Sequence, residues 1–166
     1  MNRLQRLLRH LTTTRFNGRR AFPPHTLKAI QAAIADGERC HRAEVRLIIE
    51  AALPLGALLE NMPSRGRAHE LFSRYRIWDT EENCGILIYI NLADHKVEIV
   101  ADRTVGRALN ASEWQAACRT MTEGFHRGEF HDSAVAGVRQ LNELLAKNFP
   151  ADGSQANQLS DRPLVL

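Results

Sequence analysis

The feature of this sequence that most limits its fold is a continuous apolar run near its middle. The stretch GILIYIN contains an unbroken apolar segment from Ile86 to Ile90. A short run of this kind is typical of a strand that is buried on both faces, and such strands lie inside α/β sheets that helices cover. No apolar run approaches the ~18 residues that a membrane span requires, so we expect no transmembrane segment.

Two further segments alternate between apolar and polar residues, as half-buried strands do. They are EVRLIIE, residues 44–50, and KVEIVA, residues 96–101. A helical pattern after Ser64 separates the first of them from the central run, which predicts a parallel pair with a right-handed crossover. The link between the central run and the third strand is only residues 92–95, which predicts an antiparallel hairpin.

Helical patterns flank these strands on both sides in the sequence. Pro23 and Pro24 open the first one, because a proline at the start of a helix costs no hydrogen bond. The order helix–strand–helix–strand–strand–helix–helix predicts a layered α/β domain. We assign residues 1–20 to a basic amphipathic arm, residues 21–150 to the α/β domain, and residues 151–166 to a flexible tail without a helical stripe.

Charge is distributed unevenly along the chain. Residues 1–20 contain six arginines and no acidic residue, whereas the formal net charge of the whole chain is +3, so the remainder is mildly acidic. A nucleic-acid-binding protein should carry its basic patch on the folded surface. We therefore expect no nucleic acid among the partners.

The arm should form a short amphipathic helix. Its leucines recur at helical spacing, and Arg3, Arg6 and Arg9 lie between them. Three roles remain open. The leucines could dock on the protein's own core, the arm could bind an anionic membrane surface or an unknown protein partner through these arginines, or it could be an organellar transit peptide.

Oxygen-bearing side chains should meet at one edge of the predicted sheet. Asp79, Glu82 and Asn83 precede the central strand, Asp102 follows the third strand, and Glu44 begins the first. Carboxylate and amide oxygens are the ligands that Ca²⁺ and Mg²⁺ prefer. The sequence therefore predicts a site for Ca²⁺ or another divalent cation here. The alternative is that acidic residues simply populate exposed loops at this edge.

A second group of possible metal ligands lies between the last two helical patterns. His126 and His131 bracket the sequence RGEF, with Glu129 and Asp132 close by. Two histidines and two acids could bind zinc. However, their spacing places no histidine pair on one helical face. We therefore favour a loop with surface histidines.

The cysteines indicate the compartment rather than a site. Cys40, Cys84 and Cys118 are widely separated and form no CxxC pair, so neither a disulfide framework nor a zinc site of paired cysteines is expected. We expect Cys84 to be a small buried side chain. A cytoplasmic protein, peripheral at the inner membrane if the arm binds lipid, fits these features.

Several of these segments together resemble one family, the TPM domain. They are the strand EVRLIIE after a helix, the helix that ends in FSRYRIWDT, the acidic loop that leads into the aliphatic strand, and the final strand VEIVADR. The resemblance covers about residues 21–150. It is closest to small bacterial members in which a basic helix is followed by RRAFP, here Arg19 to Pro23.

The resemblance implies a three-layer α/β/α sandwich with a small mixed sheet flanked by helices. Related domains include thylakoid proteins of photosystem II repair, some members bind Ca²⁺, and weak acid phosphatase activity has been proposed. The family's site would fall on the loop Asp79–Gly85. Many members read Asp-Asn-Gly there, whereas this chain inserts Cys84 between Asn83 and Gly85. Many relatives also carry a signal peptide and a membrane helix, which we do not expect here.

Three functions are compatible with these features. The first is a non-enzymatic or weakly active binding module in the maintenance of envelope or membrane proteins, dependent on a divalent metal. The second is a metal-assisted acid phosphatase of low activity that uses the same carboxylates. The third is a structural adaptor without a metal site.

Overall fold

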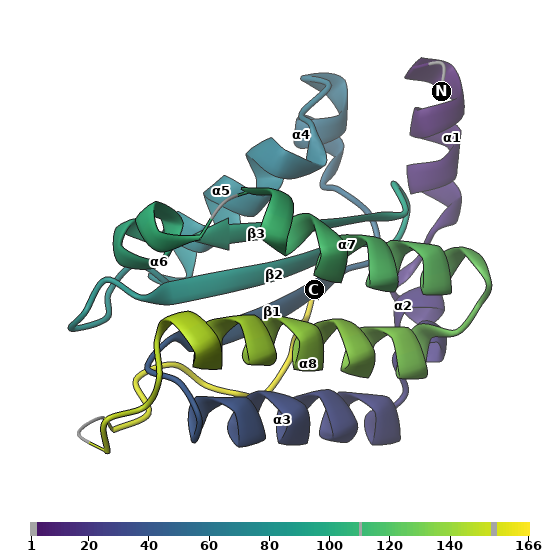
Figure 1. Cartoon of the computed structure of the whole chain (residues 1–166). Helices are drawn as coiled ribbons and strands as arrows, with labels where there is room; N and C mark the ends of the chain where they lie inside the picture. The colour runs from purple at the N-terminus through teal and green to yellow at the C-terminus, as the bar shows by residue number, and fades with distance from the viewer. Residues whose placement is uncertain (1–2, 110, 154–155) are drawn as a thin grey trace.

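The structure, a computed structural model, describes residues 3–109, 111–153 and 156–166. Within these residues, helices lie on both faces of a four-stranded mixed sheet with the strand order β3-β2-β1-β4 (Figure 1). The elements are α1 (Arg3–Thr12), α2 (Arg15–Ala21), α3 (Pro24–Glu38), β1 (Glu44–Glu50), α4 (Leu55–Leu59), α5 (Ser64–Arg74), β2 (Gly85–Asn91), β3 (Lys96–Ala101), α6 (Arg103–Ala108), α7 (Ala111–His126), α8 (Phe130–Asn148) and β4 (Leu164–Val165).

The pairing of the three long strands confirms the sequence predictions. β1 and β2 are parallel, with Leu47 opposite Ile88. β2 and β3 form an antiparallel hairpin, with Ile88 opposite Ile99. Every residue of β2 is buried, as expected for a strand that helices cover on both faces.

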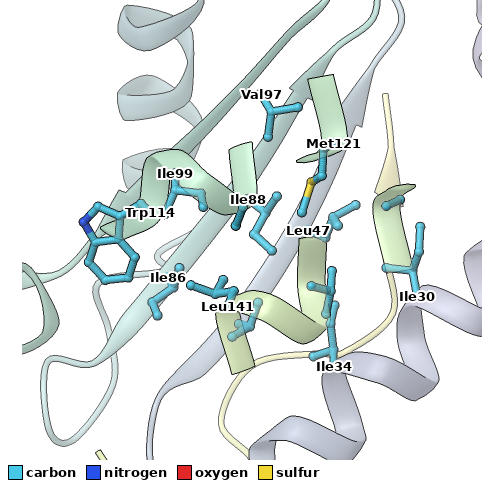
Figure 2. Close-up of a cluster of buried hydrophobic side chains, with 14 of the residues drawn as sticks. Ile30, Ile34, Leu47, Ile86, Ile88, Val97, Ile99, Trp114, Met121 and Leu141 are labelled. Carbon is cyan, nitrogen blue, oxygen red and sulfur yellow. The ribbon is translucent and has the colours of Figure 1, made fainter. Parts of the chain in front are cut away.

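Two hydrophobic clusters make the structure an α/β/α sandwich. On one face, α3, α7 and α8 cover the larger cluster, in which Ile88 points to the same side as Leu47, Ile99 and Met121 (Figure 2). On the other face, α5 covers a smaller cluster around the fully buried Tyr89. The three-layer fold expected from the resemblance is therefore present.

A close contact explains the glycine at the start of β2. A Cβ atom on Gly85 would lie 1.8 Å from the carbonyl oxygen of Ile77, much closer than any real contact. Glycine thus allows the segment after α5 to pass directly over the first residue of β2. This crossing positions the acidic loop at the sheet edge.

The C-terminal segment differs from the flexible tail that the sequence suggested. Leu164 pairs with Ile48, so β4 adds a short parallel strand beside β1. Arg46 also donates from Nη1 to the carbonyl oxygen of Arg162 at 2.8 Å. Residues 156–166 therefore cover the free edge of β1, and Leu159, Leu164 and Leu166 pack against the smaller cluster.

Among residues 3–109, 111–153 and 156–166, the structure contains no membrane-spanning helix. Neither α8 nor any other helix in these ranges is both long enough and apolar enough to span a bilayer.

Candidate functional site

The sheet register brings the predicted ligand-bearing segments to one edge. Glu44 lies opposite Gly85 in the parallel pair, and Ile86 lies opposite Ala101 in the hairpin. The backbone N–H of Asp102 donates to the carbonyl oxygen of Gly85 at 2.9 Å. The loop before β2, the start of β1 and the residue after β3 are thus neighbours.

Two of the acidic side chains at this edge form ion pairs with arginines. Asp79 contacts Arg76 at 2.7 Å, and both side chains are largely exposed. Glu82 accepts from Nη1 of Arg42 at 2.9 Å. Neither carboxylate is directed toward a shared centre with the others.

Glu44 binds the backbone of the C-terminal segment rather than an arginine side chain. Its side chain is buried, and its Oε2 accepts from the backbone N–H groups of Gln158 at 3.1 Å and Leu159 at 2.9 Å. Burial raises the pKa of Glu44, although these two hydrogen bonds oppose the shift. The carboxylate therefore fastens the C-terminal segment to the start of β1.

The two carboxylate oxygens of Asp102 differ in their contacts. Its Oδ1 accepts from the backbone N–H of Arg103 at 2.7 Å, which caps α6. Its Oδ2 is buried and has no hydrogen-bond partner among the described residues. Asn83 lies close by in a left-handed conformation (φ 52°) and accepts from Nη2 of Arg103 at 3.2 Å. Arg103 thus bridges the loop and the start of α6.

The described side chains of this edge do not form a complete cation site. Ca²⁺ prefers about 6–8 oxygen ligands. In the part of the chain that the structure describes, no three side chains of the types His, Cys, Asp and Glu lie close enough together to bind a metal ion. The open Oδ2 of Asp102 is the oxygen that could anchor a cation, with water and loop oxygens completing the shell.

The histidines considered for zinc have separate neighbours. Nδ1 of His126 donates to the carbonyl oxygen of Thr122 at 2.7 Å. Nδ1 of His131 lies 3.0 Å from Oγ1 of Thr26, and its ring lies against that of His25. The two histidines therefore do not meet at a common point.

Cys84 is buried, as expected, and its thiol donates to the carbonyl oxygen of Arg42 at 3.2 Å. Burial raises the pKa of this thiol. Because the thiolate is the reactive form of cysteine, Cys84 is poorly suited to nucleophilic chemistry.

One acidic group near this edge could not be recognised from the sequence. Oε1 of Glu38 accepts from the backbone N–H of Val45 at 2.7 Å, whereas its Oε2 is buried without a partner among the described residues. Burial, with Glu44 and Asp161 nearby, raises the pKa of Glu38 to about 9. Asp161 comes from the C-terminal segment, far along the chain from Glu38 and Glu44, so spacing could not have predicted that the three acids lie close together.

Glu38→Gln should therefore make the protein more stable at alkaline pH. The ordinary pKa of Glu38 is 4.5 and its folded value is about 9. Between these values the unfolded chain loses the proton that the folded chain keeps, so wild-type stability falls as pH rises. Because the side chain is partly exposed, we expect a gain of about 1–3 kcal/mol at pH 8 and almost none at pH 4.

Urea denaturation across this pH range measures the effect. Glu143→Gln, an exposed acid on α8, is the matched control and should show no such trend. If Glu38→Gln and the wild type have parallel stability curves at every pH, Glu38 is ionised in the folded protein.

A buried aspartate attaches α1 to the domain. Asp94, in the turn between β2 and β3, accepts from Arg6 at 2.9 Å and 2.7 Å, contacts Nε2 of His10 at 2.9 Å and accepts from Ser64 at 3.0 Å. Although burial opposes it, these hydrogen bonds hold the pKa of Asp94 well below its usual range. Nδ1 of His10 also accepts from the backbone N–H of Leu53 at 3.0 Å.

The three arginines predicted to contact a membrane or partner thus differ in role. Arg6 is committed to Asp94, and Arg3 donates to the carbonyl oxygen of Leu59 at 2.9 Å. Arg9 is half-buried, and its Nε has no partner among the described residues. The sequence contained one signal for this attachment. An acidic residue in the hairpin turn could pair with the arginines of an arm that has no acid of its own.

Three leucines of α1 remain largely outside the core, and Leu7 is half-buried, so the structure gives little support to the docking role that the sequence left open. Leu4, Leu8 and Leu11 are 61%, 54% and 59% exposed. α1 and α4 extend from the same end of the domain (Figure 1), and Leu4 and Leu59 line one groove between them. Polar contacts rather than buried leucines therefore position α1.

Comparison with known proteins identifies the family of this chain. A search of curated protein sequences found no match. The fold is similar to that in the NMR structure of the BA42 protein from the psychrophilic bacterium Bizionia argentinensis, with a TM-score of 0.75 and 23% sequence identity over 86% of this chain and 93% of that one. The family model for the TPM domain matches residues 18–144. The chain therefore belongs to the TPM domain family.

Proposed function

We propose that this TPM domain is a non-enzymatic binding module that responds to a divalent cation such as Ca²⁺. The ligand-binding edge consists of the loop Asp79–Gly85 and Asp102. The observation that most supports this proposal concerns Oδ2 of Asp102. This oxygen is buried and has no hydrogen-bond partner among the described residues. An unsatisfied buried oxygen costs about 1–3 kcal/mol, and a cation with its water would remove that cost.

The contacts at this edge favour binding over phosphatase chemistry. Glu82 and Asp79 are neutralised by Arg42 and Arg76, and the Cys84 thiol is protonated. A cation that used Asn83 would also displace Arg103 from its oxygen. Competition from this guanidinium predicts a weak affinity, in the millimolar range.

Thermal unfolding with and without Ca²⁺ tests the proposal. At about ten times the dissociation constant, binding stabilises the folded state by about 1.4 kcal/mol, or a few degrees in Tm. Asp102→Asn should abolish this rise, because the amide keeps the cap on α6 but removes the charge. The control is Asp36→Asn on α3, which removes an exposed acid elsewhere.

If the rise in Asp102→Asn equals that in the wild type, Asp102 does not anchor a cation. If the wild type shows no rise with either Ca²⁺ or Mg²⁺ at matched ionic strength, the cation response is absent. Release of phosphate from p-nitrophenyl phosphate that disappears in Asp102→Asn would favour the phosphatase instead.

A second observation favours an anionic membrane surface as the partner of α1. Leu4, Leu8 and Leu11 are exposed on a helix that belongs to an arm, residues 1–20, whose own sequence contains no acidic residue. A basic helix with exposed leucines is typical of helices that lie in the membrane interface. Each arginine near anionic lipid contributes about 1 kcal/mol. This contact would place the module at the membrane surface.

Sedimentation with vesicles measures this contact. We expect binding to phosphatidylglycerol vesicles at low salt and much less to phosphatidylcholine vesicles. Leu8→Ser should weaken binding about tenfold, because it removes one apolar side chain from the interface. Trp78→Ser, which removes another exposed apolar side chain near the acidic loop, should leave binding unchanged. Equal sedimentation of all three proteins would contradict a role for α1.

A further inference from the structure

A cavity of about 490 Å³ lies at the opposite end of the sheet from the acidic edge. α2, the turn between β2 and β3, and the junction of α7 and α8 surround it, and these segments lie together in Figure 1. Asn91, the last residue of β2, is part of its lining, so we name it the carboxyl-end cavity. Open α/β sheets bind their ligands at this end, and the volume lies within the usual range for small-molecule sites.

The floor of the carboxyl-end cavity is aromatic. Phe125 and Phe130 both line it, and their rings stack with centroids 5.3 Å apart. Phe22 lies edge-on to both rings, at 5.7 Å from each. Three rings that pack against one another form a rigid apolar floor, which suits a flat ring better than a flexible chain.

The rim of the cavity is polar and basic. Arg20 and Asn17 contribute from α2, and His95 contributes from the turn. Oδ1 of Asn17 accepts from the backbone and hydroxyl of Thr14, both at 2.8 Å, which orients its amide group. None of the described residues that line the cavity is acidic, and Arg20 alone among them has a permanent charge. One guanidinium matches a single carboxylate, which it can bind through two parallel hydrogen bonds.

The surroundings of His95 reinforce the preference for an anion. The rings of His95 and His126 lie 5.1 Å apart. Burial, with the positive charge of Arg9 and the neighbouring His126, lowers the pKa of His95, although Asp94 opposes this shift. Nε of Arg9 is buried without a partner among the described residues. Arg9 beside His95 and Arg20 in the lining thus place positive charge near the cavity, which favours the binding of an anion.

We propose that the carboxyl-end cavity binds an aromatic carboxylate, with the carboxylate at Arg20 and the ring against Phe125 and Phe130. This site is distinct from the acidic edge, so neither proposal depends on the other. The two ends of the sheet would then bind ligands of opposite charge.

Titration of the ¹⁵N-labelled full chain with benzoate tests the proposal. We expect amide shifts concentrated in residues 17–21, 91–95 and 125–130. Arg20→Gln should weaken binding at least tenfold. Arg19→Gln removes an equivalent exposed charge from the same helix turn, outside the cavity lining, and should bind as the wild type does.

Two further probes separate the parts of the ligand. Acetate carries the charge without the ring, and benzyl alcohol carries the ring without the charge, so both should bind at least tenfold more weakly than benzoate. If acetate binds as well as benzoate, the aromatic floor takes no part. If benzoate shifts no amides in these ranges, or Arg20→Gln binds it unchanged, the proposal is overturned.

Discussion

Ile88→Asp should prevent the domain from folding. Ile88 is fully buried at the centre of β2, between Leu47 on β1 and Ile99 on β3 (Figure 2). A carboxylate at this position would be isolated from water and from any positive charge. Such burial costs several kcal/mol, a large part of the about 5–15 kcal/mol by which domains of this kind are stable.

Circular dichroism and one-dimensional NMR measure this loss directly. Ile88→Val is the matched control, because it removes one methylene group and should cost only about 0.5–1.5 kcal/mol. A cooperative unfolding transition in Ile88→Asp at the wild-type temperature would contradict the central, doubly covered position of β2.

Arg67→Ala should cause the next largest loss, about 3–5 kcal/mol. Arg67 on α5 donates to both carboxylate oxygens of Glu50, at 2.6 Å and 3.1 Å, and both side chains are buried. Tyr89 also donates to Glu50, at 2.6 Å, and burial and the neighbouring carboxylate raise the pKa of its hydroxyl. Removal of the arginine would leave a buried carboxylate without its counter-charge.

Glu70→Ala provides the comparison, because Glu70 contacts the same arginine at 2.9 Å from a more exposed position. An exposed pair contributes only about 0–1 kcal/mol, so this variant should remain close to the wild type. Arg67→Ala/Glu50→Gln should recover part of the loss, because the orphaned charge is then gone. Equal urea midpoints for Arg67→Ala and Glu70→Ala would show that the buried pair contributes little.

Periodicity was sufficient to predict the three long strands of the sheet. The unbroken run from Ile86 to Ile90 requires burial on both faces, and the short link to Val97 leaves room only for a hairpin. A strand's alternation follows directly from which side chains face the core, so a single sequence carries that information. The parallel pairing of β1 and β2 followed from the helix between them.

The candidate site was harder to predict because its contacts join distant residues. Topology alone indicated that Glu44, Asp102 and the loop before β2 share an edge. It could not indicate that Glu44 binds the backbone of Gln158 and Leu159, or that Glu82 pairs with Arg42. Side-chain partners of this kind depend on the three-dimensional path of every segment.

The ends of the chain differed from expectation for a related reason. The arm's leucine stripe suggested burial, yet one aspartate outside the arm, Asp94, positions α1 through polar contacts. The last residues lack a periodic pattern, because a two-residue strand such as β4 is too short to show one. The last helix also begins inside the segment expected to be a loop: α8 starts at Phe130, so His131 and Asp132 lie on it.

The most direct test of the proposed binding edge is an amide NMR titration of the full chain with Ca²⁺. We expect saturable shifts in residues 79–85 and at Asp102 and Arg103, at millimolar Ca²⁺, and their loss in Asp102→Asn. Residues 91–95, at the other end of the sheet, should not move. If these loop amides keep their positions while Ca²⁺ is added, the acidic edge is a cluster of structural ion pairs and not a cation-responsive site.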